Sequence, residues 1–296
     1  MVLDILKLLR LQFSFMNYSC LILNLLKNEK WGIVSNKEIA IGFFDSGFGG
    51  LSVLREALTI LPDEKYIYFG DSLHAPYGTK SAREVHSLTL QGAKYLLDKG
   101  IKALVLACNT ATSVAVGDLR KKIDIPVIGM EPAIKPAANL ANKNGKILLL
   151  ATEMTLKEDK LKDLVKGLRL DDQLIKVAAS QLVTLIERGA ITRTKAYNVV
   201  KKYLGSYDFN EIEAIVLGCT HFVFYKNIIA EVVGKDVKII DGNQGTVRHL
   251  KNRLNNLGLL SAGNSSHKQV EYCNSDPNIN SAYYEEILQK IDKATN

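Results

Sequence analysis

The stretch LVLACNT at residues 104–110 predicts a strand followed by reactive and polar side chains, because four apolar residues lead directly into a cysteine, an asparagine and a threonine. A second stretch, IVLGCTH at residues 215–221, repeats this form 111 positions later. In each stretch an apolar run is followed by a small residue, a cysteine and polar side chains. The repeat is too distant for a solenoid but fits two similar halves that each present one thiol, Cys108 or Cys219, to a shared site.

Outward from these stretches, short apolar runs alternate with longer runs of helical period, such as Ser81–Asp98. Strand followed by helix, repeated along the chain, predicts an α/β fold with doubly wound, mainly parallel sheets covered by helices on both faces. The predicted strands are Lys37–Asp45, Lys65–Asp71, Lys102–Cys108, Ile125–Met130, Lys146–Ala151, Leu174–Ala179, Ala214–Cys219 and Val237–Asp241.

Polar residues gather where four of these strands end. Ligands of parallel sheets bind beyond the carboxyl ends of the strands, so these positions are where a site is expected. The four ends read FDSGFGG (44–50), GD (70–71) followed by PYG (76–78), ACNT (107–110) and GCTH (218–221).

Two thiols facing each other suit the inversion of a carbon that carries hydrogen. One thiolate removes the proton from one face while the other thiol returns a proton to the opposite face, and the roles exchange with the direction of reaction. Asp45 is a candidate partner of Cys108 and His221 of Cys219, although sequence does not decide which carboxylate serves which thiol. Substrate carboxylates could be held by the backbone N–H groups of Gly47–Gly50 and by the side chains of Ser46, Asn109, Thr110 and Thr220.

Composition excludes several other classes of protein. The 296 residues are 47% hydrophobic with a formal net charge of +7, but the lysines are spread along the chain, so no nucleic-acid partner is required. The four cysteines contain no CxxC pair, so neither a zinc knuckle nor a thioredoxin-like motif is present, and a reducing cytoplasm is expected. The other two cysteines, Cys20 and Cys273, have no polar constellation and are interpreted as structural. The glycine-rich run lacks the spacing of nucleotide-binding loops.

Residues 1–38 form an atypical extension. The apolar interval Leu11–Leu26 is interrupted by polar residues and is too short for a membrane-spanning helix, so no stable membrane association is expected. We interpret the extension as dispensable; a short amphipathic helix at a membrane surface is the alternative.

The motifs together resemble the glutamate racemases of the aspartate/glutamate racemase superfamily. The resemblance runs from about residue 39 to about residue 257 and includes five ordered motifs. They are FDSGFGGLSVL (44–54), PYG with Lys80-Ser81, ACNTA (107–111), IPVIG (125–129) and LGCTH (217–221).

The resemblance implies a cytoplasmic isomerase that interconverts L- and D-glutamate without cofactor or metal and supplies D-glutamate for peptidoglycan, and so for cell wall and cell shape. It implies that Cys108 and Cys219 are catalytic, with assistance from Asp45, His221 and, by a weaker match, Glu187. The implied substrate-binding residues are Asp45, Ser46, Tyr77, Gly78, Asn109, Thr110, Thr220 and His221.

The resemblance also implies two pseudo-symmetric α/β domains with the active site in the cleft between them, and a homodimer. The first domain would comprise residues 39–130 and 241–296, and the second residues 131–240.

Two segments depart from the superfamily pattern. Phe222-Val223-Phe224 stands where Tyr-Pro-Leu is common, and Ala179-Ser180-Gln181 where Cys-Pro is common. Neither includes a matched thiol. Two alternatives stay open: a racemase of aspartate or another amino acid from the same superfamily, or a non-catalytic binding or regulatory protein on this scaffold.

Overall fold

The computed structural model describes residues 39–140, 145–261 and 270–296. The extension 1–38, with Cys20, therefore lies outside the described residues. The described chain forms a five-stranded sheet of order β4-β3-β1-β2-β9 and a four-stranded sheet of order β6-β5-β7-β8. All neighbouring strands in both sheets are parallel. The predicted α/β fold with parallel sheets is confirmed.

The strands are β1 (Ile41–Asp45), β2 (Tyr66–Gly70), β3 (Ala103–Leu106), β4 (Val127–Gly129), β5 (Lys146–Ala151), β6 (Leu174–Ala178), β7 (Ile212–Leu217), β8 (Lys238–Asp241) and β9 (Val270–Asn274). The α-helices are α3 (Leu51–Ile60), α4 (Ala82–Asp98), α5 (Asn109–Lys122), α6 (Ile134–Leu140), α7 (Glu153–Lys157), α8 (Asp159–Gly167), α9 (Ser180–Glu187), α10 (Arg193–Leu204), α11 (Lys226–Val233), α12 (Asn243–Asn256) and α13 (Ser281–Thr295). Three short 3₁₀ helices are η1 (Ser72–His74), η2 (Tyr77–Thr79) and η3 (Thr220–Tyr225).

Local signals explain where the predicted helix over 81–98 begins. Ser81 has extended backbone angles, and its side chain accepts a hydrogen bond from the backbone N–H of Glu84, so it caps α4. The acidic Glu84 lies in the first turn, where the helix dipole favours negative charge.

The central strand β1 is buried along its whole length because helices cover both faces of its sheet. Ile41 and Phe43 belong to a hydrophobic cluster that also includes residues of α3 and α12. Phe44, which follows Phe43 and is in register with Leu106, points to the other face and packs into a second cluster with residues of α4 and α5. The near-continuous apolar run of β1 follows from this burial on both sides.

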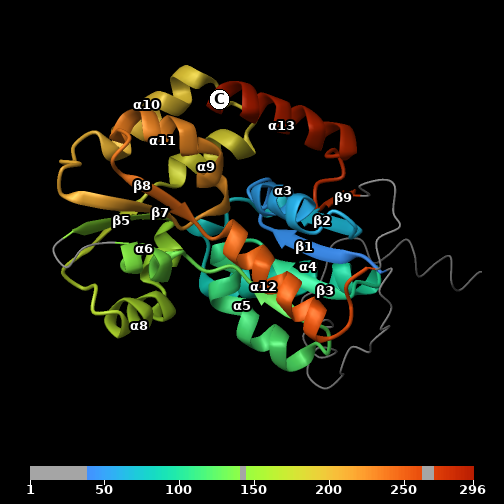
Figure 1. Cartoon of the computed structure of the whole chain (residues 1–296). Coiled ribbons are helices and arrows are strands. Elements are labelled where there is room, and N and C mark those ends of the chain that lie inside the picture. The colour runs from blue at the N-terminus through green and yellow to red at the C-terminus, as the bar shows by residue number, and fades with distance from the viewer. Residues whose placement is uncertain (1–38, 141–144, 262–269) are drawn as a thin grey trace, which may run out of the picture.

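The two sheets lie with the carboxyl ends of their strands turned toward each other, as the arrowheads in Figure 1 show. Strand β3 ends at Leu106 and β7 at Leu217, so both cysteines lie just beyond their strands and not within them as predicted. The reason at Cys108 is local, because this residue turns out of the sheet to cap α5. Strand β9 was not predicted; it joins the first sheet by pairing with β2.

The chain crosses from the first sheet to the second after β4 and returns after β8. Helix α12 then packs against α3 of the first half. In residues 39–140, 145–261 and 270–296, no helix is both long and apolar enough to cross a membrane.

A buried ion pair lies at the end of the first sheet that is distant from the thiols. Lys102 Nζ lies 2.5 Å from Glu64 Oε2, and the two side chains are 1% and 2% exposed. The ammonium group also donates to the carbonyl of Leu259, and Ser261 donates to Glu64 through its backbone N–H and its hydroxyl. The pair therefore ties the start of β3 to the segment that follows α12.

We expect Glu64→Ala to lower the free energy of unfolding by about 3–5 kcal/mol, because it leaves the Lys102 charge buried without its partner. The double variant Glu64→Leu/Lys102→Met should recover most of this loss, since it removes both charges. Urea denaturation followed by circular dichroism measures both. Asp98→Ala, which removes the exposed Lys94–Asp98 pair, is the control and should change stability by less than about 1 kcal/mol. A double variant as unstable as Glu64→Ala would contradict the prediction.

Candidate active site

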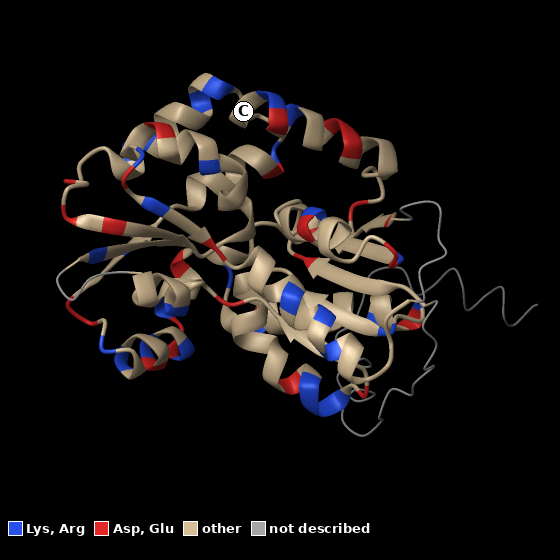
Figure 2. Cartoon of the chain, in the orientation of Figure 1, with Lys and Arg blue, Asp and Glu red and all other residues tan. Residues whose placement is uncertain are grey.

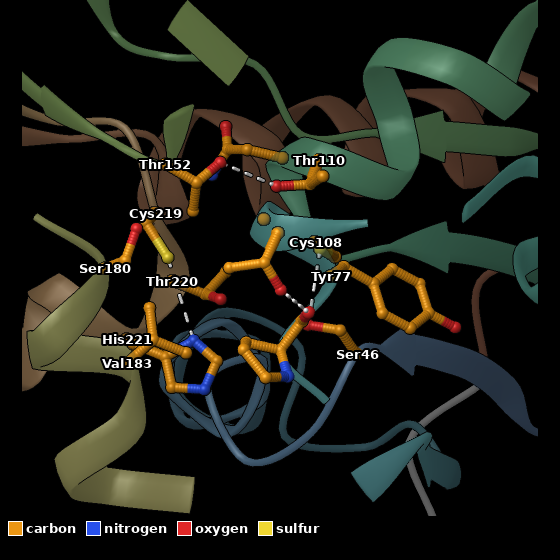
Figure 3. Close-up of a pocket in the computed structure, with 14 residues that line it drawn as sticks. Ser46, Tyr77, Cys108, Thr110, Thr152, Ser180, Val183, Cys219, Thr220 and His221 are labelled. Atoms are coloured by element: carbon orange, nitrogen blue, oxygen red, sulfur yellow. Dashed lines mark hydrogen bonds between the residues drawn. The ribbon is translucent and has the colours of Figure 1, made fainter. Parts of the chain in front are cut away.

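Side chains from both sheets line one buried cavity at the facing strand ends (Figure 3). Nine of the eleven predicted site residues line it: Ser46, Tyr77, Gly78, Cys108, Asn109, Thr110, Cys219, Thr220 and His221. The other two, Asp45 and Glu187, do not line it but hydrogen-bond to residues that do. The cavity has a volume of about 20 Å³, which is room for about one water molecule.

Cys108 is held at the beginning of a long helix. Its Sγ accepts a hydrogen bond from the backbone N–H of Ala111 at 3.4 Å, and its S–H donates to the Ser46 hydroxyl at 3.6 Å. Burial, with a smaller contribution from the charge of Asp45, raises the pKa of Cys108 to about 12, although the two hydrogen bonds lower it. In the closed cavity Cys108 is therefore a thiol at neutral pH, ready to donate a proton.

Cys219 faces the same cavity from the second sheet with a different set of neighbours. Its Sγ lies 3.7 Å from His221 Nδ1, and His221 Nε2 lies 2.5 Å from Glu187 Oε1. Burial alone would lower the pKa of His221, but the hydrogen bonds to Cys219 and Glu187 outweigh that effect and hold the pKa well above its ordinary value. The His221 imidazole is therefore placed to exchange a proton with Cys219 Sγ.

The glycine-rich turn between β1 and α3 encloses these groups closely. A Cβ added at Gly47 would collide with the Glu187 carboxylate, and one at Gly49 would collide with His221 Nδ1 and Thr220 Oγ1. The turn therefore needs glycine because side chains of the second half lie directly against its backbone.

The backbone N–H groups of this turn were expected to hold substrate carboxylates, and two of them do not. The N–H of Gly47 donates to Asp45 Oδ2 at 3.0 Å, and the N–H of Phe48 donates to Glu187 Oε1 at 2.8 Å. The turn thus satisfies the protein's own carboxylates, because two buried acidic side chains need donors.

Asp45 was expected to pair with Cys108. Its hydrogen bonds run elsewhere, since Oδ1 accepts from the Thr220 hydroxyl at 3.3 Å and Oδ2 from the turn. Burial raises the pKa of Asp45, while the charge of His221 lowers it. Asp45 acts on Cys108 through its charge and links the two halves through Thr220.

Several polar groups remain for a ligand. Asn109 is buried, and neither its amide oxygen nor its amide nitrogen has a partner among the described residues. Unpaired buried amides are costly, so this side chain is suited to a polar ligand in the cavity. Tyr77 is oriented by a hydrogen bond from its hydroxyl to Asp71 Oδ2.

Sequence reasoning missed five cavity residues: Pro76, Thr79, Thr152, Ser180 and Val183. Thr152 directly follows β5, so the strand-end rule that found the thiols could have found it too. Its hydroxyl lies 3.1 Å from that of Thr110, across the two halves. Ser180, in the segment that departs from the superfamily pattern, begins α9.

A metal centre has no ligand set in the part of the chain that the structure describes, where no three His, Cys, Asp or Glu side chains are grouped to hold an ion.

Comparison with known proteins agrees with this geometry. The sequence profile of the family described as Asp/Glu/Hydantoin racemase matches residues 49–250. A glutamate racemase of Clostridium botulinum (strain Langeland) is 49% identical over 224 residues, which cover 76% of this chain and 87% of that protein. A glutamate racemase of Clostridium novyi is 49% identical over 218 residues, covering 73% of this chain and 84% of that protein.

Solved structures give the same result. The crystal structure of a glutamate racemase from Francisella tularensis, in complex with D-glutamate, matches with a TM-score of 0.72 at 30% identity, covering 86% of this chain and 94% of that one. Glutamate racemase isoform RacE1 from Bacillus anthracis matches with a TM-score of 0.71 at 30% identity and the same coverage. Sequence and fold agree over most of both chains, and the chain therefore belongs to the Asp/Glu/hydantoin racemase family of isomerases.

Proposed function

We propose that this chain is a glutamate racemase that moves the α-proton between Cys108 and Cys219. The observation that carries the proposal is that two buried thiols, one from each sheet, line the same small cavity. A carbon held between them has one thiol on each face, which inversion of its configuration requires.

The two thiols begin the reaction in different protonation states. The Cys219 thiolate, paired with the His221 imidazolium, removes the proton from one enantiomer, and the Cys108 thiol delivers a proton to the other face. Reaction of the opposite enantiomer begins with the reverse protonation states. Glu187 orients His221 and balances its charge, and Asp45 tunes Cys108.

The substrate is held by the polar groups of the cavity wall. The unpaired Asn109 amide and the hydroxyls of Thr110, Thr152 and Thr220 are suited to the carboxylates and the amino group of glutamate. Glutamate is larger than a cavity of about 20 Å³, so the two halves separate to admit it.

The biological role of the chain follows from the proposed activity. D-glutamate is a building block of peptidoglycan, so the chain is assigned to cell wall synthesis in the cytoplasm. We place its domain boundaries at residues 39–130 with 241–296, and 131–240, and assign it a homodimeric state. Lys and Arg are interspersed with Asp and Glu along the ribbon in Figure 2, which does not favour a nucleic-acid partner.

Incubation of the purified protein with D-glutamate in D₂O, without added cofactor or metal, tests the activity. We expect loss of both the optical rotation and the α-proton NMR signal, because the returned proton comes from solvent through a thiol. Reaction of aspartate alone would keep the mechanism and change the substrate. Reaction of neither amino acid would contradict the proposal and favour a binding protein.

We expect Cys108→Ser and Cys219→Ser each to lower racemisation by at least about 10²–10⁴-fold, since each removes one of the two acid-base groups. Circular dichroism of L- and D-glutamate solutions over time measures the rate. Cys273→Ser is the matched control, because this half-buried thiol lies in β9 outside the cavity. Full racemisation by either cavity variant would exclude the two-thiol mechanism.

Gly49→Ala should lower kcat about 100-fold, because the added methyl group displaces His221 and Thr220, and a displacement of about 1 Å costs this much. Gly245→Ala in α12 is the control, since its Cβ would meet no atom within 4 Å. Steady-state kinetics of both variants measure the difference. Wild-type kcat in Gly49→Ala would show that the turn does not position the Cys219 side.

A further inference from the structure

Helix α13 packs against both halves of the molecule (Figure 1). The Tyr284 hydroxyl donates to the carbonyl of Cys273 at 2.9 Å and accepts from Asn274 Nδ2 at 2.7 Å, which anchors the helix to β9 of the first sheet. Its buried Ile287 and Ile291 belong to a cluster that includes residues of both sheets, and the helix contacts α10, α11 and η3. Helix α13 therefore joins the first sheet to η3, which carries His221.

The glycine-rich turn is held from outside by this helix. The ring of Phe48 lies 5.8 Å from that of Tyr283 and 5.4 Å from that of Tyr284, the second contact being edge-to-face. Tyr68, which packs edge-to-face on Tyr284, donates its hydroxyl to the carbonyl of Gly47 at 2.7 Å. Aromatic contacts of this kind fix the orientation of the rings. The turn is thus held at two adjacent residues, by the carbonyl of Gly47 and by the ring of Phe48.

On its inner side the same turn holds Glu187. Oε1 of this carboxylate accepts from both the Phe48 N–H and His221, whereas its buried Oε2 has no partner among the described residues. The direction of the carboxylate therefore depends on the Phe48 N–H. A continuous series of contacts runs from Tyr284 through Phe48, Glu187 and His221 to Cys219.

Cys108 is held in another way. Its partners are the Ser46 hydroxyl and the N–H of Ala111 in α5, and among the described residues neither partner hydrogen-bonds to Glu187 or His221. A change at the contact between Phe48 and α13 should therefore act on one thiol and spare the other.

We propose that Phe48 is a positioning residue for proton transfer at Cys219. Tyr283 and Tyr284 of α13 fix the ring of Phe48, and the backbone N–H of Phe48 thereby orients Glu187 and His221. The inference rests on the proposed two-thiol mechanism. Racemisation rates cannot test it, because the equilibrium constant between enantiomers is one and kcat/KM falls equally in both directions.

Elimination of chloride from 3-chloroglutamate tests each thiol separately, because it needs only one base. A thiolate removes the α-proton, the electron pair forms the Cα–Cβ double bond, and chloride leaves from Cβ. The enamine takes up a proton at Cβ to become an imine, which water hydrolyses to 2-oxoglutarate and ammonium. Cys108→Ser and Cys219→Ser should each retain elimination from opposite enantiomers and so assign one enantiomer to each thiol.

Phe48→Leu should slow elimination from the enantiomer assigned to Cys219 by about tenfold or more, because small misplacements of catalytic groups are costly. The rate for the enantiomer assigned to Cys108 should stay within about twofold of wild type, and it also reports on folding. Tyr284→Leu, which acts from the helix side, should give the same asymmetry. Ile291→Ala is the control, since it removes a buried side chain of α13 about 10 Å further along the helix and should slow both enantiomers alike or neither.

Equal loss for both enantiomers in Phe48→Leu, no loss in either, or the same asymmetry in Ile291→Ala would overturn the role of Phe48 while leaving the two-thiol mechanism intact. Cysteine variants that retain elimination from the same enantiomer would overturn the two-thiol mechanism, and this inference with it.

Discussion

Burial of both thiols dominates the chemistry of this site. Cys108 is 5% exposed and Cys219 is 7% exposed, so neither thiolate can depend on water for its stability. A buried charge is costly unless fixed partners replace its hydration. The molecule supplies those partners differently on the two sides, and this difference explains why residues beyond the cavity wall matter. Glu187 and Asp45 touch no cavity surface, yet each acts on the thiols through charge or hydrogen bonds.

The matched stretches around the cysteines give equivalent positions without equivalent surroundings. Cys108 begins a 14-residue helix, and its sulfur caps that helix, so partial positive charge from the helix terminus reaches it. Cys219 precedes a 3₁₀ turn, and it has an imidazole in place of a capping N–H. Only the second arrangement holds a full positive charge beside sulfur. Similar strand ends therefore give the two thiols different hydrogen-bond partners.

Much of the fold could be predicted because its strands and helices depend on short stretches of sequence. Apolar runs and the polar residues after four of the strands are short-range signals, and from them eight of the nine described strands and the cavity-lining cysteines were predicted. Strand β9 was not predicted because its position depends on pairing with β2, about 200 residues earlier in the chain. The use of the Phe48 N–H by Glu187, 139 positions away, is equally invisible in sequence. Such contacts arise only when segments far apart in the chain meet in the folded molecule.

The contacts between the halves differ in kind on the two sides of the cavity. The hydroxyls of Thr110, Thr152 and Thr155 form a network across one side, where each hydrogen bond can be exchanged for one to water at a net cost of about 1 kcal/mol. On the other side α13 contacts α10, α11 and η3, with Ile287 and Ile291 buried, and exposing even one large apolar side chain costs about 1.5–3 kcal/mol. Separation of the halves is therefore cheaper at the threonines than at α13. If the halves separate at the threonine side to admit substrate, the aromatic contacts around Phe48 stay in place and the Cys219 side needs no reassembly when the cavity closes.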